Sequence, residues 1–242
     1  MAAMKHVIVT GAGGGIGSAL VGDLREDGYV VTGIDASVES SERLQDRFPG
    51  VTAFHADVTQ SSEVDRAVEQ AMDAHGVPHG LVNLAGDNRL KPLEDITDND
   101  WHHLVDANLS SAFYLCRAVM PRMREAGGGR VINTSSIFGV RGVNNDAAYA
   151  AAKAGVVGLT RALATEFGPA QVTVNAIAPV VVLTERVKKM PKEHLDKQLS
   201  TIPLGRFSTE RDVNATIQFL LSDGGSFYTG QTFSPNGGDT MP

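Results

Sequence analysis

The chain has 242 residues, of which 42% are hydrophobic and 20% are charged, a balance typical of a globular domain and not of a disordered chain. Its formal net charge is -7, and no basic cluster is dense enough to indicate a nucleic-acid surface. A single cysteine excludes an internal disulfide framework, and the absence of a secretory-type start or an apolar run near ~20 residues predicts a cytoplasmic protein that does not enter membranes.

The N-terminal segment predicts a strand, a glycine-rich turn, a helix and a second strand, in that order. Gly11, Gly15 and Ile16 lie in the turn between an apolar strand at 5–10 and a helical pattern at 18–24. Glycines let a pyrophosphate approach the backbone, and the helix start offers it unpaired N–H groups. The second predicted strand, 30–34, ends at Asp35, whose carboxylate would bind the adenosine ribose hydroxyls and repel a 2′-phosphate. This pattern favours NAD as the cofactor over NADP.

Farther along the chain, apolar segments alternate with helical ones. Strands are expected at 51–55, 80–84, 130–134 and 172–177, and helices at 61–75, 98–124 and 147–167. Ser61, Asp98 and Ser208 are the expected N-caps of three helices. The alternation predicts an α/β protein: a single-domain Rossmann-type, doubly wound parallel sheet with helices on both faces, spanning 1–242.

Tyr149 and Lys153 are separated by one helical turn in an alanine-rich segment. Residues at i and i+4 share a helix face, so the phenol and the ammonium can reach the same small volume. A nearby positive charge favours the phenolate and lowers the pKa of a tyrosine, which would allow Tyr149 to exchange a proton with an alcohol. The hydroxyl of Ser135 or Ser136, at the end of a predicted strand, could hold the substrate oxygen.

In order and spacing, these motifs resemble those of the short-chain dehydrogenase/reductase family, in its compact single-domain branch. The resemblance covers nearly the whole chain. It rests on the Thr10–Gly17 turn, Asp57 with Val58, the Asn83–Gly86 segment, Asn108, Ser136, Tyr149 with Lys153, and the segment from Asn175 through Pro179 to Thr184.

The resemblance implies a catalytic set of Asn108, Ser136, Tyr149 and Lys153. Tyr149 would be the general acid/base, and Lys153 would lower its pKa and bind the nicotinamide ribose. Ser136 would orient the substrate oxygen, and strand alternation favours it over its neighbour. Asn108 would support a water-linked proton path. The implied cofactor site, which contains no metal, comprises Gly11, Gly15, Ile16, Asp35, Asp57, Val58, Asn83, Ala85, Gly86, Tyr149, Lys153, Pro179, Val182 and Thr184.

The function expected from the resemblance is hydride transfer between NAD(H) and a secondary alcohol or ketone. A β-ketoacyl-thioester reductase using NADPH or NADH is an alternative within the same class. A non-catalytic nucleotide-binding sensor or scaffold is the alternative from another class, although such proteins usually lose the Tyr or Lys. Relatives of this kind imply a homo-oligomer, a tetramer or a dimer.

Two further expectations concern the segments around the substrate. Residues 184–205 are charged and include Pro191, and they are expected to form a mobile lid. Val180 follows Pro179 where the family usually has glycine. Valine resists positive φ, so the geometry of this loop could depart from that of the family.

Overall fold

The computed structural model describes residues 4–241, so residues 1–3 and 242 of the predicted domain lie outside the described part. Its strands form one parallel seven-stranded sheet in the order β3-β2-β1-β4-β5-β6-β7. All six predicted strands are present. The seventh is too short to leave a periodic signal in the sequence. The strands are β1 His6–Thr10, β2 Val30–Asp35, β3 Thr52–His55, β4 Gly80–Asn83, β5 Gly129–Thr134, β6 Val172–Ile177 and β7 Thr232–Phe233.

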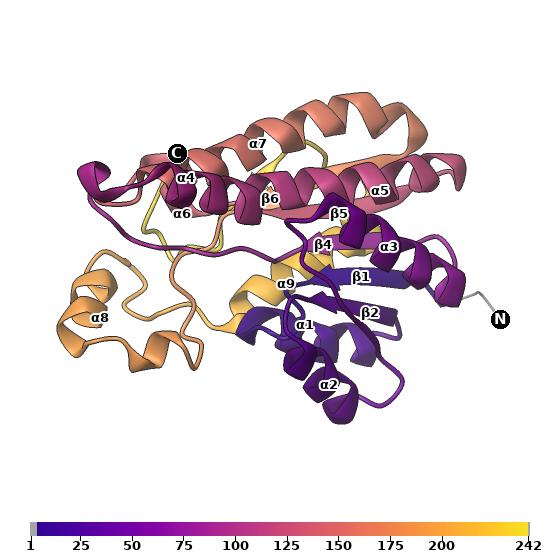
Figure 1. Ribbon diagram of the computed structural model, residues 1–242, viewed down its shortest axis with the longest axis horizontal. Helices are drawn as coiled ribbons and strands as arrows, with labels where there is room; N and C mark the ends of the chain where they lie inside the picture. The colour runs from indigo at the N-terminus through magenta and orange to yellow at the C-terminus, as the bar shows by residue number, and fades with distance from the viewer. Residues whose placement is uncertain (1–3, 242) are drawn as a thin grey trace.

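Helices cover both faces of the sheet, which confirms the predicted doubly wound architecture. Figure 1 shows α3, α4, α5 and α7 on one side of the sheet, and α1, α2 and α9 on the other. Helix α8 stands apart from both layers. The α-helices are α1 Gly15–Glu26, α2 Val38–Arg47, α3 Ser61–His75, α4 Asp98–Val105, α5 Ser111–Glu125, α6 Ile137–Arg141, α7 Ala147–Phe167, α8 Lys192–Leu199 and α9 Glu210–Leu221.

Two hydrophobic cores, one on each face, hold the layers together. Successive side chains of a strand point to opposite faces, so Ile8 packs with α3, α5 and α7, whereas Val7 and Val9 pack with α1 and α9. All three side chains are fully buried. The near-continuous apolar character of the strands follows from this burial on both faces.

The predicted helix 98–124 is wrong in its centre, where it is divided in two. Helix α4 ends at Val105, a π-helical turn spans Asp106–Ser110, and α5 continues from Ser111. A π turn inserts an extra residue without interrupting the apolar pattern, so periodicity gives no warning of it. Asn108 lies in this turn and is 2% exposed.

The three predicted N-caps are each wrong by one residue: Ser61 and Asp98 lie one residue after the observed caps, and Ser208 lies one residue before its cap. Helix α3 is capped by Gln60, without a side-chain hydrogen bond. Thr97 and Thr209 cap α4 and α9 in capping boxes, in which an aspartate at the third helical position returns a bond to the cap backbone. Because the caps are contiguous with other polar residues, composition alone did not distinguish them.

The direction of the strand order reverses between β1 and β4. From β1 the chain builds outward to β2 and β3 and then returns to place β4 on the other side. The loops that leave the carboxyl ends of these strands therefore diverge, and ligands of open α/β sheets bind in the crevice this creates. In the described residues, no helix is long and apolar enough to cross a membrane.

Gly17→Ala should destabilise the protein, because a methyl group there would lie 2.2 Å from the Gly11 carbonyl oxygen, a backbone atom. The expected loss is about 1–3 kcal/mol in the free energy of unfolding, measured by urea denaturation. Gly22→Ala is the matched control in the same helix, since its methyl group would meet only the ring edge of Phe48, at 3.2 Å. Equal stability of the two variants would contradict the close packing of Gly17 against the Gly11 carbonyl oxygen.

Candidate active site

A cavity of about 500 Å³ lies at the carboxyl ends of β1, β2, β3 and β4, where the strand order reverses. Its walls come from the glycine turn, the end of β2, the loop after β3 and the loop after β4. The structure brings together six residues predicted for the cofactor site, which line this cavity: Gly11, Asp35, Asp57, Val58, Ala85 and Gly86.

The glycine turn packs too closely against its neighbours to admit side chains. Gly11 has φ +64°, and a Cβ there would lie 3.0 Å from the backbone nitrogen of Ala85. A Cβ on Gly13 would lie 2.4 Å from Ser40 Cβ, and one on Gly15 would lie 2.8 Å from Thr184 Cγ2. The bare backbone and the start of α1 thus form a cradle that fits the pyrophosphate of a dinucleotide.

Asp35 ends β2 at the wall of this cavity. Its Oδ2 accepts a hydrogen bond from the Gly13 backbone N–H at 2.9 Å, and its Oδ1 accepts one from the Ser37 N–H at 3.0 Å. Two backbone donors fix the orientation of the carboxylate. None of the side chains that line the cavity is Lys or Arg.

Ser136, Tyr149 and Lys153 come together where β5 passes into α6 and packs against α7. Ser136 caps α6 and accepts a hydrogen bond from the Phe138 N–H at 3.2 Å. The Ser135 hydroxyl donates instead to the Lys153 carbonyl oxygen at 2.8 Å, so it is committed to joining β5 to α7. The Lys153 ammonium lies 5.6 Å from the Tyr149 ring centre and donates to the Thr134 carbonyl at 2.8 Å.

Burial is the largest cause of the pKa shifts of Tyr149 and Lys153. It raises the pKa of Tyr149 to about 12, although a hydrogen bond with Ser136 acts in the opposite direction. It also lowers the pKa of the Lys153 ammonium to about 7. The sequence led us to expect a lowered phenol pKa. The structure differs because burial of the phenol itself is the largest cause of its pKa shift. Lys153 is also only 3% exposed, so desolvation disfavours its charge.

Asn108 is held with its amide nitrogen fixed and its oxygen free. Its Nδ2 donates to the carbonyl oxygens of Asp87 and Leu104, both at 2.8 Å. Its Oδ1 is buried and has no hydrogen-bond partner among the described residues. A Cβ on Gly86 would lie 2.5 Å from this oxygen and 3.4 Å from Lys153 Nζ, so Gly86 keeps a narrow space open between them.

The other predicted cofactor residues lie outside the cavity wall. Ile16, in the first turn of α1, is partly buried and packs against the hydrophobic core. The Asn83 amide points into the core and donates to Asn133 Oδ1 at 2.8 Å. Val182 is buried and bridges to Ser208. Pro179 presents its carbonyl oxygen to the Ile137 N–H at 3.4 Å.

Val180 has no positive φ, so it adopts a backbone that valine tolerates. Its side chain is buried against Ile137 and Ile202, residues of the Ser136 turn and of the segment after α8. The substitution of the usual glycine therefore adds an apolar contact next to Ser136 without straining the loop.

Sequence reasoning missed several lining residues, including His103 and Ala107. Asp87 Oδ2 accepts a hydrogen bond from His103 Nε2 at 3.0 Å, which joins the loop after β4 to α4. His103 and Ala107 reach the cavity only through the packing of a helix distant in sequence, and nothing local distinguished them.

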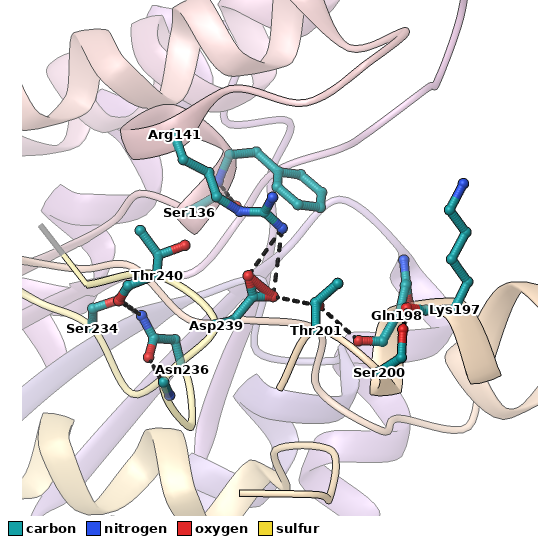
Figure 2. Close-up of polar contacts among 12 residues, drawn as sticks. Ser136, Arg141, Lys197, Gln198, Ser200, Thr201, Ser234, Asn236, Asp239 and Thr240 are labelled. Atoms are coloured by element: carbon teal, nitrogen blue, oxygen red, sulfur yellow. Dashed lines mark hydrogen bonds and ion pairs between the residues drawn. The ribbon is translucent and has the colours of Figure 1, made fainter. Parts of the chain in front are cut away.

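Helix α6 is tied to the C-terminal region by a polar network (Figure 2). Arg141 Nη2 lies 3.0 Å from Asp239 Oδ1, and Thr201 Oγ1 donates to Asp239 Oδ2 at 3.0 Å. The Asp239 side chain is only 3% exposed. One carboxylate thus joins α6, the end of the segment containing α8, and the C-terminal loop.

The fold and this site define a nicotinamide-dependent oxidoreductase. A family described as enoyl-(acyl carrier protein) reductase matches residues 11–240. A 3-oxoacyl-[acyl-carrier-protein] reductase of Pseudomonas aeruginosa is 37% identical over 241 residues, 98% of each chain. Enzymes with the same name from Staphylococcus aureus and Thermotoga maritima are 35% identical over 242 residues, with 98% of each chain covered, and 34% over 238 residues, with 97% covered. The chain belongs to the short-chain dehydrogenase/reductase family.

Asp239→Asn should loosen the segment 184–205, because the amide cannot replace the charged bonds to Arg141 and Thr201. Loss of about 1–2 kcal/mol of tethering would speed local opening roughly 5- to 30-fold. Limited trypsin digestion, which can cut at Lys192 and Lys197 of α8, measures this rate. Asp223→Asn is the control, since that carboxylate is 95% exposed; equal cleavage of both variants would exclude the tether.

Proposed function

We propose that this chain reduces 3-oxoacyl thioesters to 3-hydroxyacyl thioesters with a nicotinamide coenzyme. The observation that carries the proposal is similarity over essentially the full length to several 3-oxoacyl-[acyl-carrier-protein] reductases, at 34–37% identity. The relatives' names favour the thioester alternative over the broader interpretation as a general alcohol dehydrogenase. The presence of all four expected catalytic side chains argues against a non-catalytic sensor.

In the proposed mechanism, a 3-oxo group docks with its oxygen between Ser136 and Tyr149. When bound, the coenzyme supplies the hydride. Ser136 orients the oxygen and steadies its developing charge, while Tyr149 donates the phenol proton to it. Lys153 holds a positive charge beside the ring, and the free Oδ1 of Asn108 supports return of the proton through water and Lys153.

We further propose NAD(H) as the preferred coenzyme. Asp35 supports this, because its carboxylate stands at the cavity wall with fixed orientation and would repel a 2′-phosphate. The lack of Lys or Arg among the lining side chains supports it as well. The same geometry favours a second candidate, oxidation of a secondary alcohol. In that direction Tyr149 would accept the proton of the alcohol, and the oxidised coenzyme would accept the hydride.

Residues 184–205 are proposed to act as the substrate lid of one catalytic domain. Helix α8 projects away from the helical layers in Figure 1, and Pro191 stands at its N-cap and separates it from the preceding turn. The chain is also proposed to form homo-oligomers, tetramers or dimers. Trp101 and Phe113, on α4 and α5, support this because 43% and 42% of their surfaces are exposed.

Wild-type protein should reduce an acetoacetyl thioester with NADH faster than simple ketones, measured by loss of NADH absorbance. Tyr149→Phe should lower kcat roughly 10²- to 10⁴-fold, because the phenyl ring cannot donate the proton, whereas NADH binding should change little. Tyr228→Phe is the control on an exposed tyrosine. Wild-type turnover by Tyr149→Phe would refute the mechanism, and inactivity towards every thioester would refute the substrate class.

Asp35→Ala combined with Ala36→Arg should shift the preference from NADH to NADPH. Removing one negative charge and adding one positive charge at the cavity wall should change the ratio of the two kcat/KM values on the order of 10- to 100-fold. Asp35→Ala with Ala36→Gln is the matched control, which removes the acid without adding a cation. An unchanged ratio would mean that Asp35 does not meet the ribose.

A further inference from the structure

Asp146 is a buried carboxylate to which the proposed mechanism assigns no role. It is 2% exposed at the N-cap of α7, yet its side chain makes no capping bond. Oδ2 accepts a hydrogen bond from Asn88 Nδ2 at 3.1 Å, and Oδ1 is buried with no hydrogen-bond partner in the described chain. Burying a carboxylate with a single neutral donor costs free energy, so a carboxylate at this position calls for a functional explanation.

The position of Asp146 relative to the reacting phenol is set by the helix. Asp146 is the N-cap directly before α7, Tyr149 lies in the first turn of that helix, and Lys153 lies one turn farther on. Tyr149 therefore stands between an anion one turn before it and an ammonium one turn after it. The two charges act on the phenol in opposite directions: the ammonium favours the phenolate, and the carboxylate disfavours it.

Asp146 differs from other acidic groups of the loop after β4, α4, the π turn and the C-terminal loop, which have cationic partners or a local hydroxyl donor. No Lys, Arg or His nitrogen in residues 4–241 lies within 4.0 Å of the Asp146 carboxylate. The contacts of these other acidic groups are Asp87 with Arg89 and His103, Asp100 with Lys91, Asp239 with Arg141, and Asp106 with the Ser110 hydroxyl.

We propose that Asp146 is a positioning residue whose unpaired negative charge keeps Tyr149 in its protonated form, the form that donates to the substrate oxygen during reduction. The inference rests on the proposed role of Tyr149 as proton donor. Burial is the largest cause of the raised pKa of Tyr149, and the Asp146 charge raises it further. Asp146 thus biases the site towards reduction and delays oxidation to higher pH.

The test is the pH dependence of kcat/KM for oxidation of a 3-hydroxyacyl thioester by Asp146→Asn. Without the charge the phenolate forms more readily, so the midpoint should move to lower pH on the order of one unit. Asp146→Glu, which keeps the charge, should retain the wild-type midpoint. A uniform loss of activity with an unmoved midpoint would show a purely structural role and overturn the proposal.

A second measurement needs neither substrate nor coenzyme. Ultraviolet absorbance of the phenolate after stopped-flow pH jumps, with the Tyr149→Phe signal subtracted, reports the titration of Tyr149 before the chain unfolds. Asp146→Asn should ionise Tyr149 at lower pH than wild type does. A shifted titration in a protein inactive towards thioesters would support this inference and refute the substrate class. An unshifted titration in an enzyme active towards thioesters would refute this inference and support the substrate class.

Discussion

The proposed catalytic site depends on one buried lysine, Lys153. Lys153 is 3% exposed, and its hydrogen bond to the Thr134 carbonyl joins α7 to the last residue of β5. The Ser135 hydroxyl returns a bond from that strand to the Lys153 carbonyl. Gly139 completes the contact, since a Cβ there would lie 2.7 Å from the Lys153 carbonyl carbon. Ser136, between these contacts, is thereby fixed relative to Tyr149.

Desolvation gives this arrangement its chemical character. A solvated lysine would hold its charge firmly and pull the phenol pKa down. Burial lowers the pKa of Lys153 to about 7 and raises that of Tyr149 to about 12, so the protein groups alone favour a neutral phenol. In the proposed function, Tyr149 of the ligand-free site is thus ready to donate a proton. A shift towards the phenolate, which accepts a proton, must come from the ligands that bind there.

Much of the fold could be predicted because parallel strands buried on both faces are continuous in apolar character. Three of the four strands that contribute to the cavity have a residue with a local signal at or just after their ends: glycine after β1, Asp35 at the end of β2, and Asp57 after β3. The tyrosine and lysine also share a regular helix, so their proximity followed from spacing alone. Asn83 was predicted as a cofactor residue, and its side chain donates to Asn133 inside the core. Both faces of β4 are buried, so no polar alternation indicates which face a side chain takes.

What escaped prediction depends on tertiary packing. The π turn at Asp106–Ser110 turns Asn108 towards Gly86, and no pattern in the sequence marks it. The Asp239 network joins residues nearly a hundred positions apart in the chain, and each of its members alone resembles a surface side chain. Burial is likewise not evident from the sequence. The phenol pKa was expected to be lowered by Lys153, whereas burial of Tyr149 itself raises that pKa.

The two ends of the proposed site follow opposite electrostatic rules. At the coenzyme end, Asp35 is held by backbone N–H donors at 2.9 and 3.0 Å, which stabilise its charge and keep it available to ribose hydroxyls. At the catalytic end, Asp146 has one neutral donor, and burial raises its pKa. The first carboxylate can recognise a ligand because its charge is supported. The second carboxylate has no cationic partner in the part of the chain that the structure describes, so its charge acts on Tyr149. Substitution of Asp35 should therefore change the coenzyme preference, and substitution of Asp146 should change the pH dependence of oxidation.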